Sequence, residues 1–423
     1  MYIRQKLEAY VKKYFKKHPE VKLIIIAGSV GKTSTKNAIA TVLSSKYRVR
    51  MHNGNHNTHL SAPLAILGID YPDKVNSLVE WFKVFKAARL RIKQPTDVDV
   101  IIQELGTDRI GEIYHFGKYL KPDIGVVTAV SPEHMEFLKT IDNVAREELA
   151  AANFSKWALI NKDDIDGKYS EYLTNPNIDT YGTSGNSEYH FIDEDFTIEN
   201  GHKGQFIAPE LKSPLGIQLK LLGDHTLRPA IAAGAIAVKL GLNSNEIIKG
   251  FSEIKSIPGR MNVLRGFNNS IIIDDTYNSS PLAAVCALQT LYGLNVPQRI
   301  AVIGSMNELG DSSAEEHKKV GLLCDPAELA WVITVGDDAN KYIAEIAKSK
   351  GCQVKACKNS LEAGAFVRKV VESGAVILFK GSQGGIFLEE AVKIVLHSTD
   401  EEEQLVRQSP EWMKKKDNYF SKF

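Results

Sequence analysis

The sequence predicts an α/β fold, in which a doubly wound domain built around a phosphate-binding loop is followed by a Rossmann-like α/β domain. Two observations predict this fold. Short apolar runs alternate with helical patterns along most of the 423 residues, which is typical of parallel sheets covered by helices. One apolar run, residues 23–27, leads directly into the turn Gly28-Ser-Val-Gly-Lys-Thr-Ser34 and then into a helical pattern.

Charge and composition exclude several classes of protein. The chain has 52 Lys and Arg against 51 Asp and Glu, and its net charge of +1 lacks the basic excess of a nucleic-acid-binding protein. The four cysteines have no metal-ligand spacing. We expect Cys352 and Cys357 to be a reduced pair, and a disulfide between them is the alternative. No apolar run approaches the roughly 20 residues that cross a bilayer, and the first residues lack a secretory signal. We therefore predict a cytoplasmic protein.

The turn at residues 28–34 has the composition of a phosphate-binding loop. Its glycines free backbone N–H groups at the start of a helix, where the helix dipole favours an anion. Lys32 is then placed to reach the β- and γ-phosphates of a nucleotide, and the Thr33 hydroxyl to hold Mg²⁺. Ile26 stands where the general loop has a further glycine, and a chance turn between strand and helix is the alternative. The nucleotide-binding residues predicted here are Gly28, Ser29, Val30, Gly31, Lys32, Thr33 and Ser34.

Two amphipathic helices are predicted around this core. Residues 1–21 carry apolar side chains at helical spacing with lysines between them, which predicts a helix docked on the domain. Residues 75–95 combine Trp81 and Phe82 with a basic run that ends at Lys93. A packed helix with one solvated face is the ordinary interpretation of residues 75–95. Peripheral contact with a membrane, or with a lipid-linked substrate, is the alternative.

Polar side chains follow two further strands of the first part. Glu104 ends one apolar strand, and His134 lies just past the next. Ligands bind at the carboxyl ends of parallel strands, so Glu104 and His134 are candidate metal ligands beside Thr33. A surface carboxylate and a structural histidine are the alternatives. The polar loop at residues 52–57, which includes Asn57, is either a plain turn or a ligand-facing loop.

The remaining pattern predicts further strands and a second α/β part. Strands are predicted at 157–161, within 176–222, and then at 270–273, 299–303, 331–335 and 375–379. Polar groups follow the later strands at 274–278, 304–308 and 380–382. Because this second part has no phosphate loop, we expect it to complete a site rather than to make its own. The predicted domains are residues 1–21, 22–256 and 257–400, with a tail at 401–423 that is either a peripheral helix or a solvated end.

Taken together, the motifs resemble those of the Mur ligase family, and most closely the branch that adds D-alanyl-D-alanine to a UDP-linked muramyl tripeptide. The resemblance covers residues of roughly 22 to 395. Each motif alone is weak, and their order and spacing make the set specific. The motifs are Gly28-Ser-Val-Gly-Lys-Thr-Ser34, Gly54-Asn-His-Asn57, Glu104-Leu-Gly106, Gly111-Glu-Ile113, Lys121-Pro-Asp123, Glu133-His134, Asn161-Lys-Asp-Asp164, Gly259-Arg-Met261, Asp274-Asp-Thr-Tyr-Asn278, Asn307-Glu-Leu-Gly310 and Lys380-Gly-Ser382.

The resemblance implies an ATP-dependent ligase with a two-ion magnesium site. In this family ATP phosphorylates a carboxylate, an amine attacks the resulting acyl phosphate, and an amide forms as phosphate leaves. The resemblance places Lys32 at the γ-phosphate and Thr33 at the first Mg²⁺. It places Glu104 and His134 at the second Mg²⁺.

The resemblance also assigns residues of the second part to the site. Arg260 and Asp275 are expected to close on the nucleotide, and Tyr277 to lie against its ribose or adenine. Lys380 is expected to contact the acyl phosphate or the incoming carboxylate. Because the groups come from two domains, we expect domain closure to gate the reaction. The remaining nucleotide-binding residues that the resemblance implies are Asn57, His225 and Asn278.

Four departures separate this chain from the family pattern. Only about 20 residues precede the phosphate-loop strand, where the family has a domain that holds the UDP-sugar. Glu148 stands where many relatives have a carbamylated lysine, and its carboxylate offers the same anionic oxygens to a metal; a surface helix glutamate is the alternative. Thr226 and Pro229 follow His225 where relatives have asparagines that grip the nucleotide. Gln383 stands where an arginine is common.

We therefore expect an ATP-dependent amide ligase that acts through an acyl phosphate in the synthesis of cell-wall peptide or a related polymer. Its expected partners are a small-molecule or lipid-linked acid, an amino-acid or dipeptide amine, and a separate substrate-binding protein in place of the sugar domain. A ligase of a different acid is the first alternative. A nucleotide-binding partner protein without catalysis is the second, and the changes at Glu148, Thr226 and Pro229 favour it.

Overall fold

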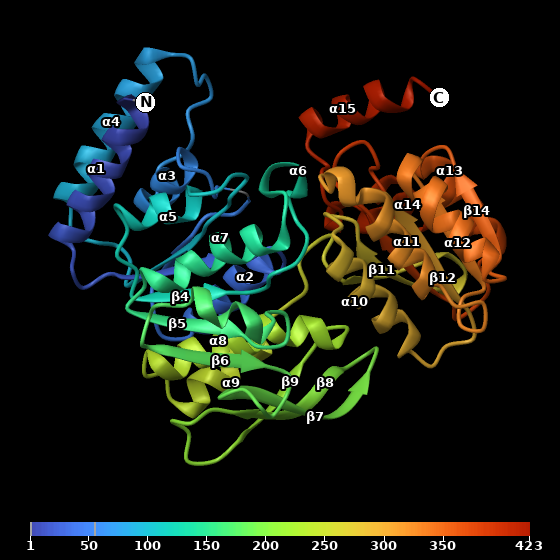
Figure 1. The fold of residues 1–423 in the computed structure, drawn as a ribbon, viewed down its shortest axis with the longest axis horizontal. Coiled ribbons are helices and arrows are strands. Elements are labelled where there is room, and N and C mark those ends of the chain that lie inside the picture. Colours follow the sequence, from blue (N-terminus) through green and yellow to red (C-terminus); the bar gives the residue numbers. More distant parts are fainter. Residues whose placement is uncertain (1, 55) are drawn as a thin grey trace. The chain divides into compact units, whose positions relative to one another are not determined.

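The structure is a computed structural model that describes residues 2–54 and 56–423 (Figure 1). The chain divides into two compact units. The first comprises Met1–Ser131, Phe137–Leu219 and Leu227–Ile254, and the second comprises Pro132–Glu136, Lys220–Thr226 and Lys255–Phe423. Across the described ranges, no helix is long and apolar enough to span a bilayer.

The first unit is built on a nine-stranded sheet with the order β2-β3-β1-β4-β5-β6-β7-β8-β9. Neighbouring strands from β2 to β7 are parallel, and β8 is antiparallel to both of its neighbours, β7 and β9. The predicted doubly wound domain with added strands is confirmed. The strands are β1 (Lys22–Ala27), β2 (Val49–Met51), β3 (Val100–Glu104), β4 (Ile124–Val127), β5 (Trp157–Asn161), β6 (Ile178–Gly182), β7 (Tyr189–Thr197), β8 (Gly201–Ile207) and β9 (Leu215–Leu219).

Helices cover both faces of this sheet. Side chains alternate along β1, so Leu23 and Ile25 face the core shared with α1 and α4, while Ile24 and Ile26 face the layer that contains α2. An apolar run buried on both faces is what a central parallel strand requires. The helices are α1 (Tyr2–Lys17), α2 (Lys32–Leu43), α3 (Ser61–Leu67), α4 (Leu78–Lys93), α5 (Glu112–Gly117), α7 (Ile141–Asn153), α8 (Leu227–Lys239), α9 (Ser244–Ser252) and the 3-10 helix η1 (Gly167–Tyr172), with α6 (Met135–Leu138) where the chain returns from the segment Pro132–Glu136.

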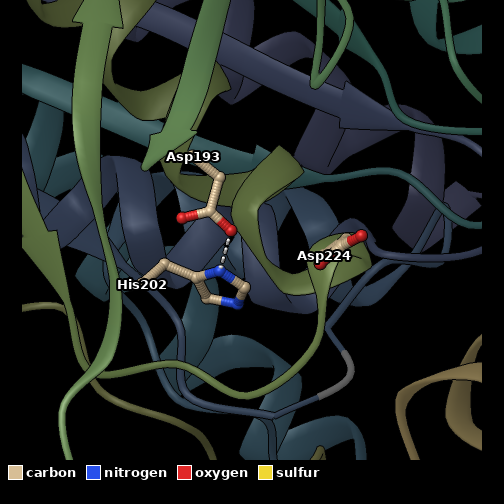
Figure 2. A group of neighbouring side chains, drawn as sticks. All are labelled: Asp193, His202 and Asp224. Carbon is tan, nitrogen blue, oxygen red and sulfur yellow. Dashed lines mark hydrogen bonds and ion pairs between the residues drawn. The ribbon is translucent and has the colours of Figure 1, made fainter. Parts of the chain in front are cut away.

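A buried histidine joins two strands of the antiparallel extension. His202 of β8 is 1% exposed, and its Nδ1 lies 2.7 Å from Oδ2 of Asp193 in β7 (Figure 2). Phe196 of β7 stands opposite His202 in the strand register, with the two ring centroids 4.5 Å apart. A buried imidazole needs a polar partner, so Asp193 stabilises this packing of β7 on β8.

The second unit is built on a six-stranded sheet with the order β10-β11-β15-β12-β13-β14. Only β10 is antiparallel to its neighbour, which confirms the predicted Rossmann-like α/β arrangement. Its strands are β10 (Asn262–Arg265), β11 (Ile271–Asp275), β12 (Arg299–Gly304), β13 (Trp331–Val335), β14 (Val354–Cys357) and β15 (Val376–Lys380). Its helices are α10 (Pro281–Tyr292), α11 (Ser313–Leu323), α12 (Ala344–Ser349), α13 (Ser360–Val370), α14 (Glu389–Val395) and α15 (Pro410–Phe420), with short turns η2 (Asp224–Thr226), η3 (Phe267–Asn269), η4 (Gly310–Ser312), η5 (Ala339–Ile343) and η6 (Thr399–Gln404).

Three short strands have no counterpart in the sequence prediction, and all three lie at sheet edges. β2 ends the first sheet, and β10 and β14 end the second. Their side chains alternate between buried and exposed positions or are only half-buried. An edge strand needs no continuous apolar run, and therefore leaves little trace in the sequence.

The tail is anchored by buried charges rather than solvated. In α15, the Lys416 side chain is 1% exposed, and its Nζ lies 3.0 Å from Glu389 and 2.6 Å from Glu390 of α14. Arg407, just before α15, forms a two-pronged ion pair with the fully buried Glu389. Of the two predicted alternatives for residues 401–423, the helix is therefore confirmed and the solvated end is wrong.

We expect Lys416→Met to lower the free energy of unfolding by about 3 kcal/mol, because it removes the buried cation that Glu389 and Glu390 share. Chemical denaturation of the full chain measures the change. Lys414→Met, at an exposed position of the same helix, is the matched control and should change little. Equal stabilities for the two variants would show that the buried pairs contribute nothing.

Candidate functional site

Two glycines shape the loop between β1 and α2. Gly28 and Gly31 have φ angles of 130° and 87°, a region that favours glycine. A Cβ atom on Gly28 would lie 2.2 Å from Oγ1 of Thr128, so a larger residue would push the loop away from the end of β4. Gly31 is the N-cap residue of α2 and has no side chain with which to cap that helix end. The positive end of α2 therefore faces the loop, where an anion is favoured.

Hydroxyl groups hold the loop in this shape. Ser29 Oγ lies 2.9 Å from Ser131 Oγ and also accepts a hydrogen bond from the Ser131 N–H. Thr128 Oγ1 donates to the carbonyl of Val30 at 2.6 Å. The Lys32 ammonium folds back and donates to the Gly28 carbonyl. The loop is thus preformed, with its lysine lying over it.

A buried carboxylate reaches the same loop from α7. Glu148 is 3% exposed, and its Oε2 accepts the Gly28 N–H at 2.6 Å. The alternative of a surface glutamate is therefore wrong. A carboxylate acceptor makes this a strong hydrogen bond, and it places the Glu148 oxygens beside the loop.

The preceding residue, Glu147, has a separate structural task that the sequence did not reveal. Its carboxylate accepts hydrogen bonds from the N–H groups of Gly111, at 2.6 Å, and Ile113, at 2.5 Å. Thr107 Oγ1 donates to it at 3.3 Å. Burial raises the pKa of Glu147, although these hydrogen bonds oppose the shift. Two adjacent glutamates therefore fix two different loops at one end of the sheet.

Glu104 lies next to the phosphate loop because β3 pairs with β1. The register sets Glu104 opposite Ile26, two residues before Gly28. Thr33 Oγ1 donates to Glu104 Oε2 at 3.1 Å, and Lys36 Nζ lies 3.5 Å from the same oxygen. The carboxylate is 5% exposed, so a surface role is excluded. Two oxygens of the kind that Mg²⁺ prefers thus stand side by side, and the residues present fit the ion.

The polar loop at 52–57 packs against the end of β3. Asn57 accepts the Gly106 N–H through its carbonyl at 2.9 Å, and a Cβ on Gly106 would lie 2.7 Å from the Asn57 side chain. Gln103 Nε2 donates to the His56 carbonyl at 2.7 Å. The loop therefore stands beside Glu104, while Asn55 lies outside the described residues.

In the second unit, a buried aspartate holds the turn that carries Arg260. Asp274 ends the apolar part of β11 and accepts the N–H of Gly259 at 3.0 Å. It also accepts the N–H and the hydroxyl of Thr276, at 3.2 and 2.6 Å. Burial raises the pKa of Asp274 to about 6. Asp274 thus fixes two neighbouring turns. The next residue, Asp275, makes different contacts.

Asp275 and Lys380 form a buried ion pair at the ends of β11 and β15. Lys380 Nζ lies 2.9 Å from Asp275 Oδ2 and donates to the Asn278 carbonyl at 2.5 Å. Asp275 Oδ1 accepts the Met261 N–H at 3.3 Å. The parallel register sets Asp275 opposite Lys380, so the sheet itself brings the two charges together.

Arg260 lies over the ring of Tyr277, and Arg407 of the tail binds the backbone of the same tyrosine. The guanidinium carbon of Arg260 is 4.4 Å from the centre of the Tyr277 ring. Arg407 donates to the carbonyls of Thr276, at 2.6 Å, and Tyr277, at 3.0 Å, while holding Glu389. Sequence reasoning missed Arg407, because nothing in a polar tail marks one arginine as buried.

His134 lies on the rim of a small cavity in the second unit. Its Nδ1 is 2.9 Å from Glu308 Oε2, and this contact lowers the pKa of Glu308. Glu133 lies 3.8 Å from the other ring nitrogen. The cavity is about 110 Å³, and its lining includes His134, Asn278, Asn307 and Gln383.

The predicted site residues are divided between the two units. Glu104 and His134 belong to different units. That they share one metal ion therefore stays a prediction. The first unit holds Gly28, Ser29, Val30, Gly31, Lys32, Thr33, Ser34, Asn57, Glu104 and Glu148. The second unit holds His134, His225, Arg260, Asp275, Tyr277, Asn278 and Lys380.

Family profiles match both units. The Mur ligase middle domain matches residues 26–237, and the glutamate ligase domain of Mur ligases matches residues 259–383. The chain belongs to the Mur ligase family. This confirms the resemblance that the motifs suggested. It also confirms an ATP-dependent, ADP-forming amide ligase, which is the chemistry of the family.

Similar Mur ligases are known from several bacteria. The chain is 29% identical to UDP-N-acetylmuramoyl-tripeptide–D-alanyl-D-alanine ligase of Bacillus subtilis over 385 residues, which are 89% of this chain and 76% of that one. It is 27% identical to the enzyme of the same name from Rickettsia prowazekii, over 88% of this chain and 77% of that one.

Solved Mur ligase structures share the fold. MurF from Acinetobacter baumannii aligns with a TM-score of 0.76 at 23% identity, over 92% of this chain and 79% of that one. MurF from Thermotoga maritima in complex with ADP aligns with a TM-score of 0.74 at 22% identity, over 94% and 84%. Both alignments span the two sheets described here.

We expect Glu148→Gln to lower kcat by about 10- to 100-fold while leaving stability nearly unchanged. Glutamine keeps an acceptor for the Gly28 N–H but removes the negative charge. Phosphate release and denaturation, measured on the same preparation, separate the two effects. Arg146→Gln, on the exposed side of α7, is the matched control.

A companion variant tests the exchange of a carbamate for a carboxylate. Glu148→Lys with added bicarbonate should recover at least part of the rate, because a carbamylated lysine carries the same charge. If Glu148→Ala has the same rate as the parent chain, Glu148 is not part of the site.

Proposed function

We propose that this chain joins the carboxylate of a cell-wall peptide to the amine of an amino acid or dipeptide. The single observation that carries the proposal is the cluster at the phosphate loop. There the Glu148 carboxylate bonds to the Gly28 N–H, and Thr33 bonds to Glu104. Buried anionic oxygens beside a phosphate loop are what a magnesium-dependent phosphoryl transfer needs.

The first unit's residues bind and orient the phosphates in this proposal. Lys32 swings from the Gly28 carbonyl to the γ-phosphate and neutralises charge that develops there. Thr33, Glu104 and His134 are the proposed holders of Mg²⁺, which in such sites neutralises charge on phosphate oxygens. Glu148 keeps the loop in place and adds negative charge close to the ion.

The second unit's residues bind the nucleotide and the reacting carboxylate. Arg260 and Tyr277 form a stacked pair that suits a ribose or an adenine face. Asp275 and Asn278 hold Lys380 in a fixed position, from which its ammonium can contact a carboxylate or an acyl phosphate. His225 is the remaining proposed nucleotide contact.

The acid and the amine are proposed from the relatives. The curated relatives are named for joining D-alanyl-D-alanine to a UDP-N-acetylmuramoyl tripeptide, and the amine proposed here is therefore a D-alanyl dipeptide or a single amino acid. The acid is a muramyl peptide. A lipid-linked form of that acid is the second candidate, favoured by the exposed apolar side chains of α4. A separate substrate-binding protein would then present the acid.

Phosphate release from ATP tests the proposal. Full-length protein is incubated with a UDP-linked or a lipid-linked muramyl tripeptide as the acid, and with D-alanyl-D-alanine or single amino acids as the amine. We expect release only when an acid and an amine are both present. Lys32→Ala should lower the rate by at least about 100-fold. Lys203→Ala, an exposed lysine of β8, is the matched control.

Other outcomes would change the assignment. Tight ATP binding without turnover for any pair would favour a nucleotide-binding partner protein. Release with an acid outside the muramyl peptides would assign a ligase of a different acid. Release with an acid but no amine would contradict amide formation.

A further inference from the structure

The positive charge of this protein is concentrated on one pair of helices. Together α1 and α4 carry eleven Lys and Arg and only two acidic residues, Glu8 and Glu80. Their net charge is therefore +9 in a chain whose total is +1, which leaves −8 for the rest. A near-neutral total thus hides a strongly cationic surface element.

The exposed face of α4 carries large apolar side chains among these cations. Leu78 is 82% exposed, and Val79 and Phe82 are each 66% exposed. At about 100° per residue, these positions fall on one arc of the helix. That arc also holds Lys83, Lys86, Arg89, Leu90 and Lys93, all exposed.

The opposite face of α4 is already used for packing. Trp81, Val84, Phe85 and Ala88 are buried in the core of the first unit. The outward apolar residues are therefore not part of that core. Helix α4 has two apolar sides, and only one of them has a partner within the described part of the first unit.

Helix α1 is fastened to α4, so the two present one surface. The two helices lie side by side in Figure 1 and are in contact. Arg89 Nε donates to Tyr10 Oη at 3.1 Å, and Lys6 Nζ lies 4.2 Å from the centre of the Phe85 ring. On α1, Tyr2 is 69% exposed, and Lys12, Lys13, Lys16 and Lys17 are exposed as well.

We propose that the outward face of α1 and α4 binds an anionic phospholipid surface. Aromatic and aliphatic side chains would enter the interface between headgroups and acyl chains, while the surrounding lysines and arginines contact the headgroup phosphates. For such a helix, binding strength rises with both the apolar area that is buried and the attraction to anionic lipids, so the two features of this face act together.

The charge and the apolar side chains of this face favour an anionic membrane over a second copy of the chain or a nucleic acid. A second copy of the chain, packed through the same face, would bring two lysine-rich surfaces together and be repelled. A nucleic acid would use the cations but gain nothing from Leu78 and Val79. An anionic membrane uses both features at once.

This attachment goes beyond the proposed ligase activity and needs no turnover. It would hold the first unit at a bilayer, where a lipid-linked acid resides. The attachment is measured without ATP, acid or amine, so its failure and the failure of the ligase assignment are distinguishable.

Vesicle co-sedimentation of the full chain tests the proposal. One set of vesicles contains equal parts of phosphatidylcholine and phosphatidylglycerol, and the other contains phosphatidylcholine alone. We expect binding to the first set only, with a partition coefficient that falls steeply between about 0.1 M and about 1 M salt. Lys83→Glu with Lys86→Glu should lower it by at least about 25-fold, at about fivefold for each lysine lost. Leu78→Ser with Phe82→Ser should lower it by about tenfold at constant charge.

Matched variants elsewhere on the surface serve as controls. Lys212→Glu removes an exposed lysine, and Leu322→Ser removes a 57% exposed leucine of α11. Both should bind like the parent chain. Equal binding to both sets of vesicles, or binding to neither, would overturn the proposal. The proposal would also fail if the chain self-associates and if Leu78→Ser with Phe82→Ser abolishes that self-association without lowering vesicle binding. Retention on nucleic acid without vesicle binding would also overturn it.

Discussion

The hydrogen bond from the Gly28 N–H to the buried Glu148 carboxylate ties the phosphate loop to the helix behind it. At 2.6 Å and with a charged acceptor, this bond is among the stronger ones available to a backbone amide. It depends on Gly28, since a Cβ there would collide with Thr128. The loop, the end of β4 and helix α7 are therefore fixed as one piece. Glu104 joins that piece through Thr33, so the anionic groups around the phosphate site have settled positions before any ligand arrives.

In the second unit, too, buried charged side chains fix the backbone turns that carry candidate site residues. Asp274 fixes two turns, Asp275 holds Lys380, and Arg407 braces the backbone beside Tyr277. Arg407 depends in turn on Glu389, and α15 adds Lys416 to that buried network. The tail thus helps to hold the turns that carry Arg260 and Tyr277, so the loss of a buried charge there should disturb these turns as well as lower the stability of the chain.

The sequence predicted the central strands, the turn at residues 28–34 and the place of Glu104 at the end of β3, because buried parallel strands and their polar ends leave continuous, local patterns. It left Glu148 undecided between a metal-site carboxylate and a surface glutamate. The burial of Glu148 in the structure excludes the surface glutamate. It missed the edge strands, which need no apolar run. It also missed Glu147, Arg407 and Lys416, since a charged residue in a polar stretch shows its burial only when its partner, distant in the chain, is known.

The most direct test of the ligase assignment follows the oxygen of the acid. A peptide acid that supports phosphate release is labelled with ¹⁸O in its carboxylate, and the released phosphate is analysed by mass spectrometry. Transfer through an acyl phosphate predicts that each phosphate carries one labelled oxygen, because the carboxylate oxygen attacks the γ-phosphorus and leaves with it when the amine displaces phosphate. Unlabelled phosphate would mean that water attacks ATP directly, and would contradict the account.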